Sequence, residues 1–401
     1  MEIVLISLLY VSLFISLYWL QVIFVDEKKA KKIGTYPSVS IVIPAYNEET
    51  SIKDAIKSLL NLDYPKDRYE IIVVDDGSTD KTIDIVKEFK HVKLITQKNS
   101  GKASALNTAL RNCNSELFVC LDADSRVEAR ALLETIGHLS DKKVAAAISA
   151  IKIDEPKSFI EKLQWHEYLM SSFLRRLMSR ANMLNMTHGV FSVYRREILL
   201  KVGGFDENNL TEDYEIAMRL FKHGYTIKMD NGSVGYTKAP KNFKNLTKQR
   251  ERWARGYIFN GIKYRKMFFN KEYGTLGLVH LPMTLVGILL LLITTFIVFF
   301  KFLRGAFNSV LDIAVVKTDL LKLIKLPDIR FLLNIDNLLY FPILIGLCIS
   351  IYFCYKAHQS AGEKLKYPFV FFVYFLYYGF IHSFVWTKSI LKEVGGAKRK
   401  W

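Results

Sequence analysis

The sequence predicts an α/β domain with a mainly parallel sheet, accompanied by membrane helices. Between about residues 36 and 240, short apolar runs alternate with helix-like segments, which is the pattern of βαβ units. Two of these runs stop on paired carboxylates, in Ile71–Asp80 (IIVVDDGSTD) and Cys120–Asp124 (CLDAD). Ligands bind at the carboxyl ends of the strands in such sheets. The acidic strand ends therefore indicate a site for a metal ion and an anionic ligand.

The composition indicates a chain with both soluble and membrane-embedded parts. Of its 401 residues, 50% are hydrophobic and 24% are charged, and the net charge is +17. Many of the basic residues flank apolar runs, where they fit anionic lipid headgroups on the cytoplasmic side of a bilayer. Such a distribution does not form a groove-reading surface, so no nucleic-acid partner is expected. The four cysteines form no CxxC pair, and we expect them to fill the core rather than to bind zinc.

An N-terminal membrane helix is predicted for residues 1–25. Ile3–Val25 is almost uninterrupted in its apolar character, and about 23 residues suffice to cross a ~30 Å hydrocarbon core. A cleaved signal peptide is disfavoured, because no basic segment precedes the run and no small-residue cleavage site follows it. Asp26–Lys32 carries four lysines. The positive-inside rule then places the following domain in the cytoplasm.

The α/β domain is predicted to span residues 36–240. Strands are expected at Val39–Ile43, Ile71–Val74, Val92–Thr96, Leu117–Leu121, Ala145–Ile153, Gly189–Tyr194 and Tyr225–Met229. Helices are expected at Glu49–Asn61, directly after Ser78–Asp80, and at Lys102–Asn112, Phe159–Met178 and Tyr214–Lys222. No GxGxxG follows the first strand, so the dinucleotide-binding fingerprint is absent.

Residues 241–273 are predicted to form an interfacial helix region. Lys241–Lys263 has helix-forming composition, with charged residues on one face and aromatic residues among the apolar ones. The segment contains the sequence QRERW.

Three further membrane spans with an amphipathic connector and a basic tail are predicted in residues 274–401. The spans are Leu276–Phe302, Leu338–Cys354 and Pro368–Trp386, and the connector is Leu303–Asn337. One span before the domain and three after it place the C-terminus outside. The basic tail Lys398–Lys400 favours the opposite side. The sequence leaves the side of the tail open.

Asp122 and Asp124 form a DxD at the end of a predicted strand. Two aspartates in a loop are usually solvated or cap a helix, but these follow about 45 residues after another aspartate pair at a strand end. Carboxylates of this kind suit Mg²⁺ or Mn²⁺, which typically share one or two of them with substrate phosphates. Such an ion would neutralise a diphosphate leaving group.

Three further motifs each have a structural and a functional interpretation. Asn99–Asn107 offers a glycine, Lys102 and a helix N-terminus to a phosphate, or is an ordinary helix start. Thr211-Glu212-Asp213 offers a general base or a capping box. Gln249, Arg252 and Trp253 share a helix face that could hold a sugar or a diphosphate, and the same residues suit a membrane interface.

Taken in order, the motifs resemble those of the processive membrane glycosyltransferases of family 2, which include synthases of cellulose, chitin, hyaluronan and poly-N-acetylglucosamine. The matching segments are Ile43–Glu49, Val74–Asp80, Gly101–Asn107, Asp122–Asp124, Thr211–Asp213 and Gln249–Trp253. A full set in this order is specific, although each member alone is not. The likeness covers roughly Val39 to Tyr257 and is strongest to the compact poly-N-acetylglucosamine and chitooligosaccharide synthases.

The resemblance implies a cytoplasmic GT-A fold, which is Rossmann-like, and a role for each motif residue. Tyr46, Glu48, Asp75, Asp76, Lys102 and Asp122 would bind the nucleotide part of a UDP-sugar, with Asp76 and Asp75 reading the uracil. Asp122 and Asp124 would hold Mg²⁺ or Mn²⁺. Asp213 would be the catalytic base, and Glu212, Gln249, Arg252 and Trp253 would bind the acceptor.

The resemblance also implies an inverting transfer of N-acetylglucosamine or another hexose onto a growing polysaccharide, coupled to export, by a multi-pass enzyme of the plasma membrane. An alternative is a single addition to a lipid acceptor, such as ceramide or a polyprenyl phosphate. A transporter or scaffold with a degenerate nucleotide fold is a third hypothesis. It is disfavoured by the intact carboxylate set and by the small number of spans.

Overall fold

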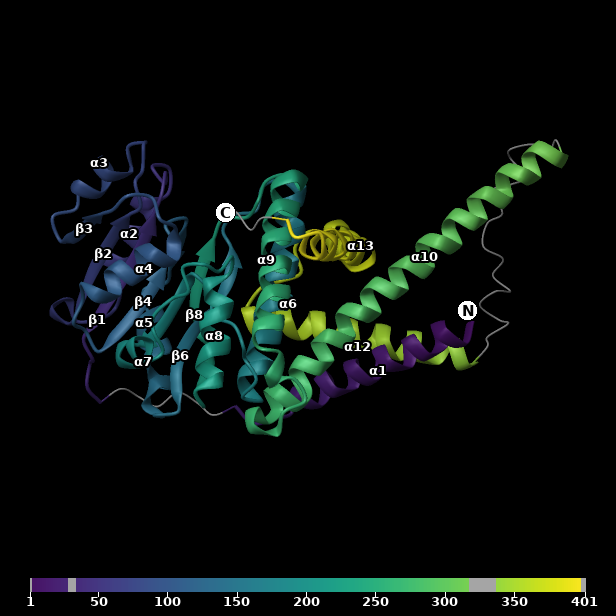
Figure 1. The fold of residues 1–401 in the computed structure, drawn as a ribbon, viewed down its shortest axis with the longest axis horizontal. Coiled ribbons are helices and arrows are strands. Elements are labelled where there is room, and N and C mark those ends of the chain that lie inside the picture. The colour runs from purple at the N-terminus through teal and green to yellow at the C-terminus, as the bar shows by residue number, and fades with distance from the viewer. Residues whose placement is uncertain (1, 28–33, 317–336, 398–401) are drawn as a thin grey trace.

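The computed structural model describes residues 2–27, 34–316 and 337–397, and an eight-stranded sheet lies at the centre of its α/β domain (Figure 1). The strands are β1 Val39–Ala45, β2 Tyr69–Asp75, β3 Val92–Thr96, β4 Leu117–Leu121, β5 Ser125–Val127, β6 Val144–Ile153, β7 Val190–Arg195 and β8 Thr226–Thr237. Their spatial order is β3-β2-β1-β4-β7-β6-β8-β5. β1 to β4 are parallel, β6 and β8 are parallel, and β7 runs antiparallel to both of its neighbours. The mainly parallel α/β sheet predicted from the sequence is confirmed.

The central strands read as apolar runs in the sequence because both faces of the sheet are covered. Ile41 and Ile43 of β1 belong to one buried cluster, whereas Val42 between them belongs to the other. All seven predicted strands are present. β5 was missed because it has three residues, and the second half of β8 was missed because Asn231-Gly232 indicates a turn. Residues 230–233 form an irregularity in the pairing of β8 with β6, after which the strand continues.

The helices of the domain are α2 Ile52–Leu60, α3 Thr82–Lys87, α4 Lys102–Arg111, α5 Ala131–Ile136, α6 Phe159–Arg180, α7 Arg196–Lys201, α8 Glu212–Lys222 and α9 Phe243–Lys263. Those predicted from apolar spacing are present. α5 and α7 were not predicted, because six residues are too few to display a helical period. Lys81 is the N-cap residue of α3, and Asp80 before it stabilises the first turn, since its Oδ1 accepts the amide of Thr82 at 3.0 Å.

The start of α8 is fixed without the expected capping box. Thr211 is the N-cap residue, but its side chain accepts no capping hydrogen bond. Its Oγ1 instead lies 3.4 Å from Asn209 Oδ1 and accepts from Asn260 Nδ2 at 3.2 Å. The amide of Tyr214 donates to Asp213 Oδ1 at 2.7 Å. The capping-box prediction was therefore wrong, because the hydroxyl of Thr211 accepts a hydrogen bond from Asn260 of α9 instead of from an amide of its own helix.

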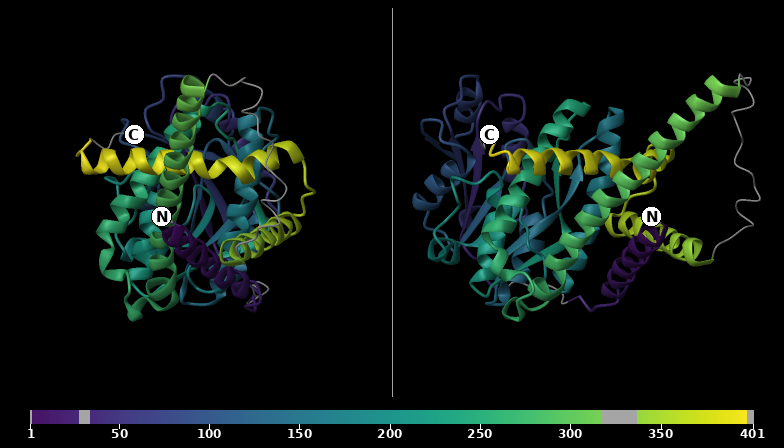
Figure 2. Two further views of the ribbon diagram at one scale, coloured as in Figure 1. Left: turned by 90° about the vertical axis from the view of Figure 1, so that its right-hand side faces the viewer. Right: turned by 45° about the vertical axis from the view of Figure 1, so that its right-hand side comes forward.

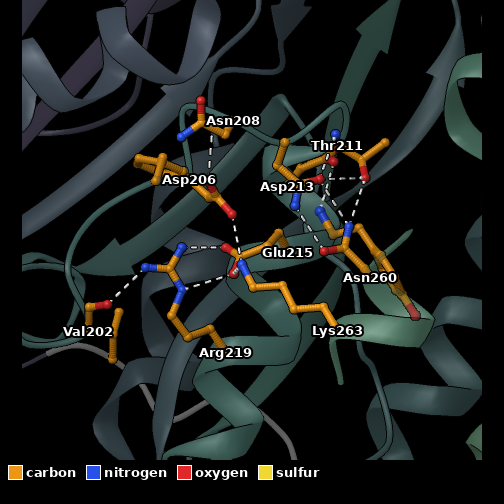
Figure 3. A network of polar contacts seen from close by, with 12 residues as sticks. Val202, Asp206, Asn208, Thr211, Asp213, Glu215, Arg219, Asn260 and Lys263 are labelled. Carbon is orange, nitrogen blue, oxygen red and sulfur yellow. Dashed lines mark hydrogen bonds and ion pairs between the residues drawn. The ribbon is translucent and has the colours of Figure 1, made fainter. Parts of the chain in front are cut away.

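A buried polar network joins α8 to α9 (Figure 3). Glu215 is fully buried, and its Oε1 accepts from Lys263 Nζ at 2.7 Å and from Tyr264 Oη at 2.6 Å. Arg219 bonds to the same carboxylate, and Lys263 also reaches Asp206 at 2.7 Å. Removing one partner of such a group leaves an uncompensated buried charge. α8, whose first turn carries Asp213, is consequently held against α9.

Among the described residues, four helices are long and apolar enough to cross a membrane: α1 Glu2–Val22, α10 Leu281–Val316, α12 Asn337–Ala361 and α13 Pro368–Val394. α1, α10 and α12 extend away from the sheet domain, whereas α13 runs across their direction (Figures 1 and 2). Residues 303–316 continue α10 without a break. The predicted connector therefore does not begin at Leu303, because no proline interrupts the helical hydrogen bonding there. Its residues 317–336, most of the lysine-rich flank and Lys398–Lys400 lie outside the described residues.

Gly256 allows the close packing of α9 on Thr211, and this gives a direct test. A Cβ added at Gly256 would lie 2.3 Å from Thr211 Oγ1. We expect Gly256→Ala to lower the free energy of unfolding by about 1–3 kcal/mol, as overpacking does. The measurement is thermal unfolding in detergent.

Gly261, on the same helix, is the matched control. A Cβ there meets nothing within 4 Å. Because glycine is a poor helix former, Gly261→Ala should leave stability unchanged or raise it by up to about 1 kcal/mol. Equal effects of the two substitutions would contradict the close-packing account.

Candidate active site

Acidic side chains meet at the carboxyl edge of the parallel strands. β1, β2 and β4 are adjacent and parallel, so the loops that follow them lie at one edge of the sheet. These loops carry the sequence-predicted residues Tyr46, Glu48, Asp75, Asp76, Asp122 and Asp124. α8 contributes Glu212 and Asp213 from its first turn.

The ammonium group of Lys102 lies among three carboxylates. Its Nζ is 2.6 Å from Asp122 Oδ1 and 3.0 Å from Glu212 Oε1. Burial alone would favour the neutral amine, but Asp122, Glu212 and Asp213 raise the pKa of Lys102 well above its usual value. Lys102 is the first residue of α4 and follows Gly101, whose φ is +93°. It is therefore a permanent positive charge at the centre of the acidic site.

Asp124 and Asp213 have pKa values unusual for aspartate. Burial, followed by the charges of Asp122 and Glu48, raises the pKa of Asp124 to about 6. Burial, followed by the charge of Glu212, raises the pKa of Asp213 to about 6 as well. Strongly perturbed carboxylates in one site are typical of functional centres. A base with a pKa near 6 is well matched to proton transfer near neutral pH.

Gly189 makes room for the carboxylate of Asp122. A Cβ at Gly189 would lie 2.0 Å from Asp122 Oδ2. The carbonyl of Gly189 also accepts the amide of Asp122 at 2.7 Å. A side chain at this position would push Asp122 out of its contact with Lys102.

The two aspartates after β2 have different hydrogen-bond partners. Asp76 Oδ1 accepts from Gln97 Nε2 and from the amide of Ser100, and Asp76 Oδ2 accepts from the amide of Gly101. Asp76 therefore fixes the turn that precedes Lys102. Asp75 Oδ2 accepts two loop amides, whereas its buried Oδ1 has no hydrogen-bond partner among the described residues. Such an atom is costly unless a ligand or a water molecule bonds to it.

Asn107, at the end of the same motif, has a structural role. Its Oδ1 accepts the amide of Phe205 at 2.8 Å, and its Nδ2 donates to the carbonyl of Phe205 at 2.9 Å. Gly204 has a φ of +72°, and a Cβ there would lie 2.6 Å from Asn107 Oδ1. The two-point bond ties α4 to the loop leading to Asp213.

α9 brings the QRERW residues to the acidic site. Arg252 Nη1 donates to the carbonyl of Leu210 at 3.1 Å, and its charge acts on Asp213. Trp253 is about one-third exposed. Its indole ring lies 4.2 Å from the guanidinium carbon of Arg250, which also bonds to Gln249. Arg252 therefore lies close enough to Asp213 to act on it, while Gln249 and Trp253 contact Arg250 on the same helix.

Glu167 and Arg250 hold Trp253 in place, and sequence reasoning did not identify either of them as a site residue. Arg250 is buried and forms an ion pair with Glu167 of α6. Despite burial, Arg250 and His382 lower the pKa of Glu167 to about 2. Arg250 stood inside the recognised motif, but Glu167 lies 83 residues away with no motif of its own. Only the tertiary contact reveals it.

The fit of the site to a divalent ion rests on Asp122 and Asp124. In the part of the chain that the structure describes, no three His, Cys, Asp or Glu side chains are grouped as metal ligands. The charge of Asp122 contributes to the raised pKa of Asp124, and a cation held between the two carboxylates would relieve that repulsion. Mg²⁺ is commonly held by one or two carboxylates, with substrate phosphates completing its shell.

Comparison with known proteins agrees with this geometry. Residues 40–203 match the model of the glycosyl transferase family 2. The "Probable glycosyltransferase YdaM" of Bacillus subtilis (strain 168) is 34% identical over 245 residues, which are 58% of this chain and 58% of the relative. A poly-beta-1,6-N-acetyl-D-glucosamine synthase of Staphylococcus epidermidis is 31% identical over 266 residues, which are 62% of this chain and 64% of the relative. The chain thus spans less than two thirds of the length of either relative.

A solved structure extends the likeness of fold to the flanking helices. The mannosyltransferase PcManGT from Pyrobaculum calidifontis, determined with GDP-Man and Mn²⁺, has a TM-score of 0.60 and 20% sequence identity. The match covers 88% of this chain and 99% of that one. At this identity the match establishes a shared fold. The sequence comparisons show that residues 40–203 carry a glycosyl transferase family 2 domain.

Proposed function

We propose that the chain is an inverting β-glycosyltransferase that uses a UDP-sugar and extends a polysaccharide. The donor sugar is N-acetylglucosamine or another hexose, and the catalytic domain lies on the cytoplasmic side of the plasma membrane. The observation that carries the proposal is the cluster of Asp122, Glu212 and Asp213 around Lys102, with Arg252 of α9 acting on Asp213. Because Trp253 follows Arg252 on α9, the arrangement offers a diphosphate site, a base and a stacking surface.

The donor would bind at the edge of the sheet formed by β1, β2 and β4. Asp75 Oδ1, the buried oxygen without a partner, is the better candidate for the imide N–H of uracil, since Asp76 already accepts three hydrogen bonds. Tyr46 is half-exposed at the end of β1 and can stack on the base. Lys102 supplies a fixed positive charge near the diphosphate.

Asp122 and Asp124 would hold Mg²⁺ or Mn²⁺. When bound, such an ion would neutralise charge on the departing UDP. The ammonium group of Lys102 would neutralise part of the same negative charge on UDP. Its ion pair with Asp122 also orients that carboxylate. Glu48, whose charge acts on Asp124, belongs to the same acidic group.

Transfer would proceed by a single displacement. The acceptor hydroxyl oxygen bonds to the anomeric carbon as the bond from that carbon to the UDP oxygen breaks. The hydroxyl proton passes to the Asp213 carboxylate, which the burial of its surroundings makes a stronger base than a solvated aspartate. Arg252 and the amide of Tyr214 hold this carboxylate in position. An α-linked donor then gives a β-linked product, with one base rather than the two carboxylates of a hydrolase.

A lipid acceptor is the second candidate, and one cavity favours it. A cavity of about 470 Å³ lies between α1, α6, α10, α12 and α13. Its lining is largely apolar, with Trp19, Leu174 and Phe353 among the residues. Tyr378 and His382 also line it and contact Glu167, the partner of Arg250. A lipid chain in this cavity would lie near the acceptor side of the site.

The products distinguish the two candidates. Membranes containing the chain, given a panel of UDP-sugars with Mg²⁺ or Mn²⁺, should release UDP from one donor. Polymer synthesis predicts a ladder of radiolabelled oligosaccharides in that reaction. Lipid transfer predicts one labelled species that extracts into organic solvent. Release of UDP from no donor, in membranes where the folded chain is detected, would contradict both.

Asp213→Asn tests the assignment of the base. The substitution keeps the shape of the side chain but removes its ability to take a proton, and loss of a general base typically costs about 10²–10⁴-fold in rate. We expect UDP release to fall by that factor with little change in thermal stability. Asp84→Asn, at an exposed position in α3, is the control and should retain full activity. Undiminished transfer by Asp213→Asn would show that another group takes the proton.

The pH profile tests the environment of the same carboxylate. Because burial raises the pKa of Asp213 to about 6 and the base must be ionised, kcat should fall about tenfold per pH unit below pH 6 and level off above it. The assay is run at saturating donor and metal, so that Asp124 is held ionised. A profile that stays flat between about pH 5 and 8 would contradict this environment.

A further inference from the structure

The last apolar helix, α13, contacts the catalytic domain near its first residue. Tyr367, directly before α13, packs edge-on against Trp165 of α6 at 5.8 Å between ring centroids. Lys162 of α6 lies 4.9 Å from the Tyr367 ring. Glu363, in the preceding turn, forms an ion pair with Lys152 of β6 at 3.2 Å. The start of α13 is therefore fixed to the sheet domain.

The end of α13 contacts the same domain. Glu393 forms an ion pair with Arg255 of α9 at 2.6 Å, and both side chains are buried. Arg255 also donates to the carbonyl of Ala397 at 2.7 Å. Lys388 lies 2.9 Å from Glu251 of α9, and Lys392 bonds to the same carboxylate. These contacts fix the last two turns of the helix to α9.

The middle of α13 follows the domain as well. Tyr378 Oη donates to Glu167 of α6 at 2.6 Å. Trp386 packs edge-on against Tyr257 of α9 at 5.6 Å. α13 thus lies along α6 and α9 over its whole length.

α1, α10 and α12 are arranged differently, because each meets the domain at one end. Glu27, just after α1, pairs with Arg176 and Arg180 of α6. The C-terminal end of α12 is held by Asn231, whose Nδ2 donates to the carbonyl of Ser360 at 2.7 Å. α10 starts beside the domain, and the other ends of all three helices project away from it (Figure 1). α13 runs across these three helices, as the left-hand view of Figure 2 shows.

One face of α13 is apolar and uncovered, opposite the face that contacts the domain. The exposed residues of this face follow one another at steps of three or four residues and then, at the last one, of seven: Phe369, Phe372, Leu376, Phe380, Phe384 and Leu391. The residues packed on the domain include Tyr378, Val385 and Ser389. One apolar face and one face bearing lysines are typical of a helix that lies in the plane of a membrane interface.

We propose that α13 lies along the membrane surface and does not cross the bilayer. A helix of 27 residues is about 40 Å long, and a crossing helix would put its ends on opposite sides of a ~30 Å hydrocarbon core. Both ends of α13 are instead bound to one folded domain through ion pairs that belong in water or at an interface. The uncovered apolar face of α13 is inserted into the lipid leaflet on the side of the catalytic domain.

The lipid surface is the occupant that the rest of the structure favours. α13 packs against α10 where Gly379 faces Leu291, within the apolar span of α10. The exposed phenylalanines of α13 are therefore continuous with the apolar surface of α10.

This arrangement also changes the count of crossings. With α1, α10 and α12 crossing, the C-terminus returns to the side of the catalytic domain, where the basic residues Lys398–Lys400 are favourable. The conflict between four crossings and a basic tail disappears. The inference concerns placement alone and stands independently of which sugar or acceptor is used.

Cysteine labelling in membrane vesicles tests the placement. Cys348→Ala removes the exposed native cysteine and leaves the other three, which are buried. Single cysteines are then introduced at Lys364 before α13, at Ala397 after it, at Lys57 in the catalytic domain and at Asn308 near the far end of α10. All four positions are exposed, so the changes should not disturb folding.

A membrane-impermeant maleimide is applied to right-side-out and to inverted vesicles from an expressing bacterium. Ala397→Cys and Lys364→Cys should react in the same vesicles as Lys57→Cys, and Asn308→Cys in the opposite ones. If Ala397→Cys reacts together with Asn308→Cys, α13 crosses the bilayer and the proposal is wrong. The comparison holds whichever side the domain occupies and does not depend on activity.

Depth measurements test the lipid-facing surface. Bimane attached at Phe372→Cys, Phe380→Cys or Leu391→Cys should be quenched to the same extent by a lipid carrying a shallow doxyl group. A crossing helix spreads these positions over about 28 Å of depth, and quenching would then change steeply along it. Absence of quenching at all three would show that protein, such as a second copy of the chain, covers this face.

Discussion

The ion pairing of the partly exposed Lys102 ammonium with its carboxylates is the interaction on which the site depends. Three carboxylates from different parts of the chain, Asp122, Glu212 and Asp213, raise the pKa of this lysine, and in return it offsets part of their mutual repulsion. Ionised carboxylates gathered away from water are costly unless they are paired. Several features of the structure position this ammonium group. Gly101 has a positive φ, Asp76 accepts three hydrogen bonds, and Asn107 forms two hydrogen bonds with the backbone of Phe205.

α9 connects the two halves of the proposed chemistry. Its residues Gly256 and Asn260 pack on Thr211, which lies two residues before Asp213. The same helix carries Trp253. A shift of α9 would therefore move the base and the stacking surface together. Proton transfer needs a distance of about 2.6–3.2 Å between the heavy atoms of the base and the hydroxyl. The packing of α9 on α8 is therefore required for the proposed chemistry as well as for stability.

The membrane enters this design through α13. Glu167 accepts from Tyr378 of α13 and pairs with Arg250, which lies over Trp253. With α13 in the lipid interface, a single chain of contacts runs from the bilayer surface to the acceptor side of the site. An acceptor that leaves through the membrane, or arrives from it, would first contact the residues of this series. The apolar cavity beside Tyr378 lies at the same place.

The sequence by itself determined the central strands, the principal helices of the domain and the grouping of carboxylates at strand ends. It could do so because strands buried on both faces are apolar throughout, and parallel strands end at one edge. Which partner each group has depends on the tertiary structure: Asp76 accepts from Gln97 and from two loop amides, Asp75 has one oxygen without a partner among the described residues, and Glu167 reaches Arg250 from a distant helix. It also decided the placement of α13. Hydropathy measures how long and how apolar a helix is, whereas where its two ends dock depends on ion pairs with residues far away in the sequence.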